Sequence, residues 1–345
     1  MNLSDDHIRH LRAIADLPDL SGTKYSVIER IAMGGMGSVY LVEDTELRRK
    51  VALKVLSLPD ESENLTHRLT REAQIIASLE HPGIVPVHDV GKLPDGRVFY
   101  VMKFVQGQDL VSYCKSVTAL PDRLRVMQRI CEAVAFAHSR GVVHRDLKPA
   151  NVMIGGFGEV LVMDWGVAKA LHQNFDPDKT LTMPAIGDSG RSSDPGDTSP
   201  GTIMGTPAYM SPEQASGRIE QVDQRSDIYS LGGILYSMLT GQYPHREGDR
   251  PEGALISPRK INRNIPAAVD AICMKAMAPE PSERYQSANQ IAEEISRFLD
   301  KEPVLAHKEN IFERADRFFS RHRFIILLIA AYILVRIILY FLRDI

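Results

Sequence analysis

The chain has 345 residues, of which 44% are hydrophobic and 25% are charged, as in ordinary globular proteins. Its formal net charge of −3 argues against bulk binding to nucleic acid. Cys114, Cys131 and Cys273 lie far apart in sequence, which argues against a disulfide framework or a metal site and favours a reducing compartment. The first ten residues lack a basic region followed by an apolar run, so they are not a secretory signal.

Residues 1–300 divide into a short N-terminal segment, a strand-rich region and a helix-rich region. Residues 1–24 predict a short amphipathic helix and a linker, with Ser4 as the N-cap. From 25 to about 102, short apolar runs such as "YSVIERI", "VALKVL" and "RVFYVMKF" predict an antiparallel sheet, interrupted by one helix around "LTHRLTREAQIIASL". Helical patterns dominate 108–300. We therefore expect an α+β fold with a small sheet lobe (25–102), a hinge (103–107) and a larger helical lobe (108–300).

Residues 174–203 interrupt the helical region. Of these 30 residues, 21 are Gly, Pro, Ser, Thr or Asp, and apolar periodicity is lost. Such a segment buries too little apolar surface to offset its ordering entropy, so it is predicted to be a mobile loop.

The C-terminal part of the chain predicts a membrane anchor. Phe324–Leu342 is 19 residues long with one charge, Arg336, and a helix of that length spans about 28 Å, close to the hydrocarbon thickness. The basic segment 301–323 precedes it, so the rest of the chain is expected on the cytoplasmic side, as a single-pass protein of the cell membrane with almost no external region. Contact of this basic segment with membrane lipid is an equal alternative to a solvated helix face. A buried core or interfacial helix is the alternative reading of the span.

The first chemical motif is "IAMGGMGSVY", in which three glycines lie between two strand-like runs. Glycines allow backbone N–H groups to approach a phosphate closely. A simple hairpin turn remains an alternative for this motif alone. A strand follows the glycines, which excludes a Rossmann turn, where a helix would follow.

Charged residues in apolar surroundings form the remaining motifs. Lys54 lies within "VALKVL", and a buried lysine needs a partner, which Glu72 could supply. The segment "VVHRDLKPANVMI" combines acidic, basic and amide side chains, and "LVMDWG" follows with Asp164. Two carboxylates and an asparagine beside a glycine-rich loop are typical of Mg²⁺-nucleotide chemistry.

Together these ordered motifs resemble those of the protein kinase family, most closely the bacterial Ser/Thr kinases of eukaryotic type. The resemblance covers residues 25–300 and implies the bilobal kinase fold, ATP as phosphate donor, and Mg²⁺, with Mn²⁺ as a substitute. Ala32 stands where the first glycine of the phosphate-covering loop usually lies. The residues that the resemblance places around ATP are Ile31, Ala32, Met33, Gly34, Gly35, Met36, Gly37, Ser38, Val39, Ala52, Lys54, Met102, Lys103, Val105 and Met153.

The resemblance also implies the chemical roles of the charged residues. Lys54 would hold the ATP phosphates and Glu72 would hold Lys54, while Asp146 would accept the proton of a substrate hydroxyl. Lys148, together with Thr206, favours Ser/Thr over Tyr acceptors. The implied catalytic residues are Lys54, Glu72, Asp146 and Lys148, and the implied metal ligands are Asn151 and Asp164.

A further set of residues is implied to support this site. Glu213 would pair with Arg284, and Asp227 would brace the catalytic loop from the start of a helix. Arg145 is suited to a phosphate and would order the activation segment 164–213. Candidate phosphorylation sites near the end of that segment are Thr198, Ser199 and Thr202. A solvated insert with incidental phosphorylation is the alternative.

Trp165 is the only tryptophan in the sequence and stands where the family usually has phenylalanine. We expect it to pack near Ile76 and beside His144, leaving the chemistry intact. The sequence thus predicts an active, autophosphorylating Ser/Thr protein kinase in membrane signalling, acting on protein substrates and not on nucleic acid. A kinase-like scaffold without turnover is the rival hypothesis, and a homodimer and a helix partner for Arg336 are left open.

Overall fold

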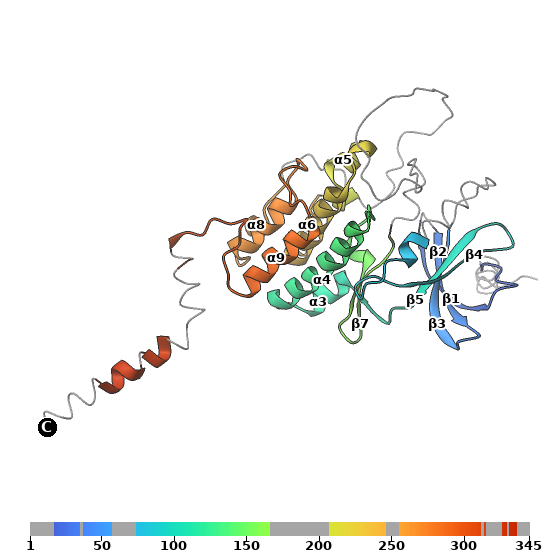
Figure 1. Cartoon of the computed structure of the whole chain (residues 1–345), viewed down its shortest axis with the longest axis horizontal. Helices are drawn as coiled ribbons and strands as arrows, with labels where there is room; N and C mark the ends of the chain where they lie inside the picture. The colour runs from blue at the N-terminus through green and yellow to red at the C-terminus, as the bar shows by residue number, and fades with distance from the viewer. Residues whose placement is uncertain are drawn as a thin grey trace, which may run out of the picture.

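The computed structural model describes residues 17–34, 37–56, 74–165, 207–245 and 255–311, residue 314, and the stretches 326–329 and 331–336. Strands gather at one end of the molecule and helices at the other (Figure 1). This arrangement confirms the predicted sheet lobe and helical lobe. The strands of the sheet lobe are β1 (Tyr25–Gly34), β2 (Gly37–Asp44), β3 (Arg49–Leu56), β4 (Val87–Lys92) and β5 (Val98–Lys103), in the antiparallel order β1-β2-β3-β5-β4.

The sheet is buried on both faces where β3 and β5 pair. Val51, Leu53 and Val55 belong to a cluster on one face, whereas Ala52 and Leu56 belong to the main core on the other. Side chains alternate between the faces of a strand, so burial of both faces explains the nearly continuous apolar run of β3.

Gly37 begins β2 directly after the glycine-rich turn. Its φ is +143°, and a Cβ built there would lie 2.1 Å from the carbonyl oxygen of Val55. A larger residue would therefore collide with β3, which fixes glycine at this point of the motif.

The larger lobe also contains a small sheet that the helical pattern of 108–300 did not predict. Strands β6 (Gly107–Asp109), β7 (Val152–Gly155) and β8 (Val160–Val162) form it. The helices of the larger lobe are α3 (Leu110–Ser116), α4 (Leu120–Ser139), α5 (Pro212–Ala215), α6 (Gln224–Thr240), α7 (Pro258–Ile261), α8 (Ala267–Ala276) and α9 (Ala288–Leu299). Its 3₁₀ turns are η1 (Pro149–Asn151), η3 (Pro207–Tyr209) and η4 (Ile219–Gln221).

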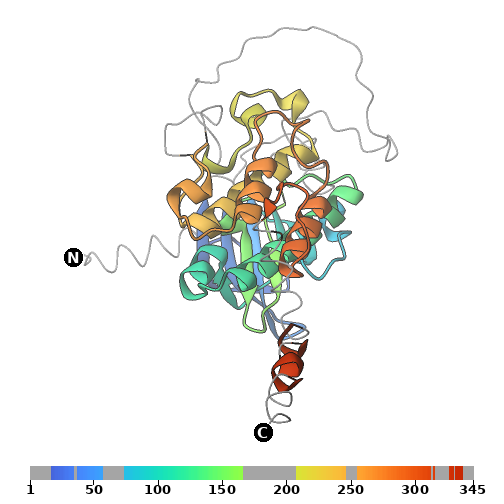
Figure 2. The same cartoon turned by 90° about the vertical axis from the view of Figure 1, so that its left-hand side faces the viewer.

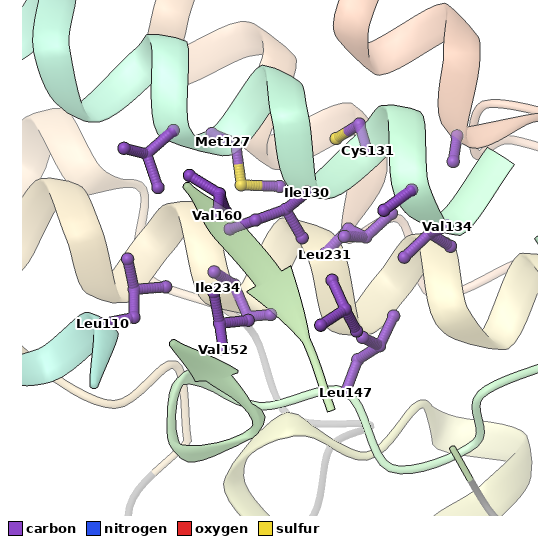
Figure 3. Packing of buried hydrophobic residues seen from close by; sticks show 14 of the residues in the cluster. Leu110, Met127, Ile130, Cys131, Val134, Leu147, Val152, Val160, Leu231 and Ile234 are labelled. Carbon is purple, nitrogen blue, oxygen red and sulfur yellow. The ribbon is translucent and has the colours of Figure 1, made fainter. Parts of the chain in front are cut away.

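Helices α4 and α6 form the centre of this lobe, and α4 also packs against α9. Their apolar side chains meet around β8, as Figure 3 shows for Met127 and Ile130 of α4, Val160 of β8, and Leu231 and Ile234 of α6. All five side chains are at most 4% exposed. The polar loops before β7 and after β8 are therefore attached to strands that pack in the buried apolar core.

Two expected helices lie largely outside the described residues. Residues 1–16 are not described, and of the helix expected around 65–79 only residues 74–77 are described as α-helix. The first helix therefore stays a prediction, and the second is confirmed only at its C-terminal end.

The C-terminal stretches 326–329 and 331–336 are helical and lie away from both lobes (Figures 1 and 2). Their leucines, isoleucines and valine at 327–329 and 333–335 are between 50% and 71% exposed. Within the described part of the chain, no helix is long and apolar enough to cross a bilayer. The span expected at 324–342 falls only partly within that part.

Candidate active site

Lys54 of β3 makes an ion pair with Asp164, which follows β8. The distance from Lys54 Nζ to Asp164 Oδ1 is 2.7 Å, and the lysine side chain is 11% exposed. Burial alone would lower the pKa of Lys54, but the neighbouring Tyr100 and Asp164 outweigh it and raise that pKa above its usual value. Lys54 therefore carries a positive charge between the sheet lobe and the helical lobe.

Asp164 has φ of +56°, a left-handed conformation that Asp adopts more readily than most residues. Met163 holds the chain immediately before it, since its N–H donates to Asn151 O at 2.9 Å. This hydrogen bond, just beyond the paired part of β7 and β8, fixes the chain before Asp164, whose carboxylate is paired with Lys54.

The loop between α4 and β7 brings together the three polar side chains of "DLKPAN". Lys148 Nζ donates to Asp146 Oδ2 at 3.0 Å, and Asn151 Nδ2 donates to Asp146 O at 2.8 Å. Asn151 is 5% exposed, whereas Asp146 and Lys148 are half-buried. A carboxylate that can accept a proton therefore lies beside a cation and a fixed amide.

Asp227, in the first turn of α6, binds the backbone at the start of this loop. Asp227 Oδ2 accepts from His138 Nε2 at 2.8 Å and from the backbone N–H of His144 at 2.7 Å. Asp227 Oδ1 accepts from the N–H of Arg145 at 2.8 Å. Burial opposes ionisation, but the hydrogen bonds and charge of His138, with His144, outweigh it, so the pKa of Asp227 lies below its usual value.

Arg145 is held by this network in an unfavourable backbone conformation, with φ of +65°. Strain of that kind costs of order 1–3 kcal/mol and persists only where the surroundings impose it. The two backbone hydrogen bonds to Asp227 impose it here.

Trp165 packs beside His144, as the sequence predicts. It is 3% exposed, belongs to the same core cluster as Ile76, and has its ring centroid 4.7 Å from that of His144. Its Nε1–H donates to Val162 O at 3.3 Å, so the extra polar group of the indole has a partner. Burial lowers the pKa of His144, and its neutral ring donates from Nε2 to Met163 O at 2.8 Å.

Glu213 and Arg284, which the resemblance pairs, form a buried bidentate ion pair. Both nitrogen–oxygen distances are 2.8 Å, and the side chains are 3% and 0% exposed. Ser226 Oγ adds a hydrogen bond to Glu213 Oε1 at 2.6 Å. Burial would raise the pKa of Glu213, but the bonds from Arg284 and Ser226 lower it to about 2.

Sequence reasoning did not single out Gln214 or His138, although both support the loop. Gln214 Nε2 donates to Arg145 O at 3.0 Å, and its Oε1 accepts from the N–H of Ser211 at 3.2 Å. The spacing of Ser211 and Gln214 is that of a capping box, which was the available signal. No local pattern marks His138, which lies 89 residues from its partner.

The described residues expected around ATP lie in β1, β2, β3 and β5 of the sheet, in the segment after β5 and in β7. Ala52 is the register partner of Met102, and Val39 that of Lys54. Ile31, Ala32, Met33 and Lys103 are exposed; Ser38, Val39 and Met153 are half-buried; Ala52, Met102 and Val105 are buried. The expected residues Gly35, Met36, Glu72, Thr198, Ser199, Thr202 and Thr206 lie outside the described residues.

The donor set suits a magnesium–nucleotide complex. Asn151 directs its Nδ2 to Asp146, so its amide oxygen is the group suited to a cation, and Asp164 supplies a carboxylate. Mg²⁺ is usually held by one or two protein oxygens together with substrate phosphates. Among the described residues no cluster of three His, Cys, Asp or Glu side chains could hold a metal by itself.

Comparison with known proteins assigns the family. Residues 25–304 match the model of the protein kinase domain. The chain is 38% identical to serine/threonine-protein kinase PknD of Chlamydia caviae over 306 residues, covering 81% of this chain and 32% of that protein. The PknD of Chlamydia trachomatis serovar D is 38% identical over 322 residues, with 84% and 33% covered.

Among solved structures, the PknI kinase domain of Mycobacterium tuberculosis matches with a TM-score of 0.60 and 25% identity, covering 79% of this chain and 95% of that one. The chain therefore belongs to the protein kinase family. It spans about a third of the length of the curated relatives that it matches.

Proposed function

We propose that this chain is a Ser/Thr protein kinase that transfers the γ-phosphate of ATP to hydroxyl groups of proteins. The observation that carries the proposal is the hydrogen bond between Met163 and Asn151. It brings the loop of Asp146 beside Asp164, which is paired with Lys54 of β3. A potential base, two candidate metal ligands and a phosphate-binding cation are thereby held on adjoining segments.

Positioning and charge provide most of the catalysis in phosphoryl transfer. Lys54 would bind the non-transferred phosphates, because its buried ammonium is already oriented by Asp164. Asp146 would orient the acceptor hydroxyl and take its proton at a carboxylate oxygen, and Lys148, 3.0 Å away, would offset negative charge on the phosphate being transferred. Asn151 and Asp164 would hold Mg²⁺, which would supply neutralisation of phosphate charge.

The activity test uses the purified full chain with Mg-ATP and a general protein substrate, followed by mass spectrometry for phosphoserine and phosphothreonine. Phosphate should appear on the substrate and on the chain itself, and Asp146→Asn should abolish both. The matched control is Asp122→Asn, since Asp122 is an exposed carboxylate paired with Arg125 on α4. A scaffold without turnover would give no phosphate with any of these proteins.

Autophosphorylation at Thr198, Ser199 or Thr202 is part of the proposal. The supporting feature is Arg145, whose guanidinium is suited to a phosphate and whose backbone is fixed by Asp227 and Gln214. Phosphosite mapping of active protein should find at least one of the three residues modified. Active protein with none of the three residues phosphorylated would contradict the proposed autophosphorylation.

Membrane attachment through residues 324–342, with the kinase domain on the cytoplasmic side, completes the proposal. Its support is the apolar run together with the exposure of Leu327, Leu328 and Leu334, since exposed apolar surface of this extent is unfavourable in water. The basic segment 301–323 favours contact with anionic lipid.

The membrane test fractionates cells that produce the full chain. The wild type should remain with membranes after an alkaline wash, and the double variant Leu328→Arg/Leu334→Arg should be released. Ile311→Arg is the control, because Ile311 is exposed and apolar but precedes the span. Wild-type protein in the soluble fraction would contradict the anchor.

A further inference from the structure

A cavity of about 200 Å³ lies in the helical lobe next to the catalytic loop. Pro149 of η1 is one of its wall residues, and it follows Lys148, whose Nζ donates to Asp146 Oδ2. Three peptide units separate Pro149 from Asp146, so their Cα atoms lie within about 11 Å of each other. An extended segment covers that distance in about three or four residues. A protein that presents a hydroxyl to Asp146 can therefore place a nearby side chain in the cavity.

The wall of the cavity is largely apolar. Leu110 of α3, Met238 of α6 and Tyr209 of η3 line it and are at most 5% exposed. Val111 and Tyr243 also line it but are 47% and 65% exposed, so they form its solvent side. An apolar group that enters removes this exposed apolar surface from water, which is favourable.

Hydrogen bonds hold the wall in place. The hydroxyl groups of Tyr209 and Ser237 are hydrogen-bonded at 3.0 Å, which joins η3 to α6. Arg123 of α4 donates from its two terminal nitrogens to Cys114 O of α3 and Met238 O of α6. The guanidinium thereby connects three helices around the cavity, which is a preformed feature of the lobe.

The charges around the cavity are of one sign. Among the described residues that line it, the charged ones are Lys115 and Arg123, and none is a carboxylate. A lysine or arginine of a substrate would lose water here, meet like charge and find no acidic partner. Every guanidinium nitrogen of Arg123 already donates to a backbone carbonyl, so the wall does not offer a free fork to a carboxylate either.

The volume of the cavity suits one side chain. Pockets that enclose a whole small ligand measure roughly 300–1,000 Å³, whereas this cavity measures about 200 Å³. Size, apolar lining and closeness to Asp146 together favour an apolar side chain of the protein that carries the acceptor hydroxyl.

We propose that this cavity selects protein substrates that have an apolar side chain, such as leucine, within about four residues of the acceptor hydroxyl, and disfavours lysine or arginine at that position. Ser237 is the specificity-determining residue, because it is the polar side chain that α6 contributes to the wall. The inference rests on the proposed function, since it takes a protein hydroxyl to be the acceptor at Asp146.

The primary test measures kcat/KM of the full chain with Mg-ATP and a set of peptides that share one acceptor serine. Each of the four positions on either side of the acceptor is in turn leucine, alanine, glutamate or lysine. At one of these positions leucine should give a kcat/KM at least about tenfold above that of lysine, and also above that of glutamate. Equal values at every position would overturn the proposal, as would a preference for lysine or glutamate.

Ser237→Glu adds a carboxylate to the wall, which gives a substrate lysine a partner. At the position selected by the wild type, the ratio of leucine to lysine should fall about tenfold. Lys115→Glu, an exposed change in the same wall, should lower the ratio in the same direction. The matched control is Ser282→Glu, because Ser282 is an exposed serine of the same lobe outside the cavity. Thermal midpoints verify that each variant is folded.

The control should keep the wild-type ratio, since it adds the same charge elsewhere. An unchanged ratio in both wall variants, or an equal fall in Ser282→Glu, would overturn the proposal. The same peptides with alanine in place of the acceptor report binding alone, by fluorescence anisotropy. Tighter binding of the leucine peptide without any phosphate transfer would remove the kinase function and support the cavity, whereas equal binding of leucine and lysine peptides would overturn the cavity proposal.

Discussion

The catalytic loop and Lys54 are held in different ways. The loop rests on Asp227, a carboxylate that is 1% exposed and accepts three hydrogen bonds from within the helical lobe. Lys54 belongs to the sheet lobe, and its ion-pair partner Asp164 comes from the other lobe and is 32% exposed in its side chain. The position of Asp146 is therefore a property of one folded lobe, whereas the position of the ammonium depends on how the lobes meet.

The same contrast separates the buried ion pairs from the exposed ones. Glu213 and Arg284 are almost fully buried with their hydrogen-bonding groups engaged, while Arg225 and Asp223, at the start of α6, are about a third exposed. Removing one member of a buried pair leaves an uncompensated charge, which exposed pairs avoid through solvent. The comparison predicts a graded series of effects.

The largest effect on stability is expected from Arg284→Met. Glu213 would be left buried without its cation, which costs about 3–5 kcal/mol of unfolding free energy. Arg225→Met should cost at most about 1 kcal/mol, because its pair with Asp223 is solvated. Urea unfolding of both variants measures the difference, and equal losses would contradict the contrast.

Asp227→Asn should have the next largest effect. An amide of the same shape loses the charge and meets the N–H groups of His144 and Arg145 with only one accepting oxygen, so at least one buried donor is left unsatisfied, at about 1–3 kcal/mol. Because the backbone of the catalytic loop is released, kcat should fall while the KM for ATP changes little. A variant with a raised KM and an unchanged kcat would show that Asp227 does not position the loop.

Stability should also depend on acid through Glu213. Its pKa is about 2 in the folded chain, below the ordinary value of 4.5, so the folded state favours the ionised form. This stabilisation is present above about pH 4.5 and is lost as the pH falls towards 2. Unfolding measured across this window should show a smaller loss in Glu213→Gln than in the wild type, and identical pH profiles would contradict the assignment.

The smallest effect is expected from Trp165→Phe. Phenylalanine keeps the contact with His144 and loses part of the indole volume and one long hydrogen bond to Val162, so we expect about 1 kcal/mol of destabilisation. Transfer activity should stay within about twofold, since Trp165 packs beside the site without entering the chemistry. An inactive variant with a wild-type thermal midpoint would contradict that view.

The sequence was most informative where chemistry requires residues close together in the chain. Asp146, Lys148 and Asn151 lie within six residues, and their contacts follow from the local turn. The change in apolar periodicity predicted the two lobes. It did not predict the small sheet of β6, β7 and β8, because strands of three or four residues are too short to show an alternation of apolar and polar residues.

Contacts between distant segments were beyond sequence reasoning unless the family resemblance implied them. Tyr100 looks like any other residue of an apolar strand, and its contact with Lys54 depends on the register of β3 and β5. Gln214 reaches Arg145 across 69 residues. The expected pair of Lys54 with Glu72 stays a prediction, since Glu72 lies outside the described residues and the structure places Asp164 against Lys54.

The most direct test of the account measures binding and transfer separately in two variants of the full chain. Asp146→Asn should bind Mg-ATP with the affinity of the wild type, as measured by the fluorescence of Trp165. Its rate of phosphate transfer should be at least about a hundredfold lower. Lys54→Met should lose affinity as well as transfer. An Asp146→Asn protein that transfers phosphate at the wild-type rate would contradict the account.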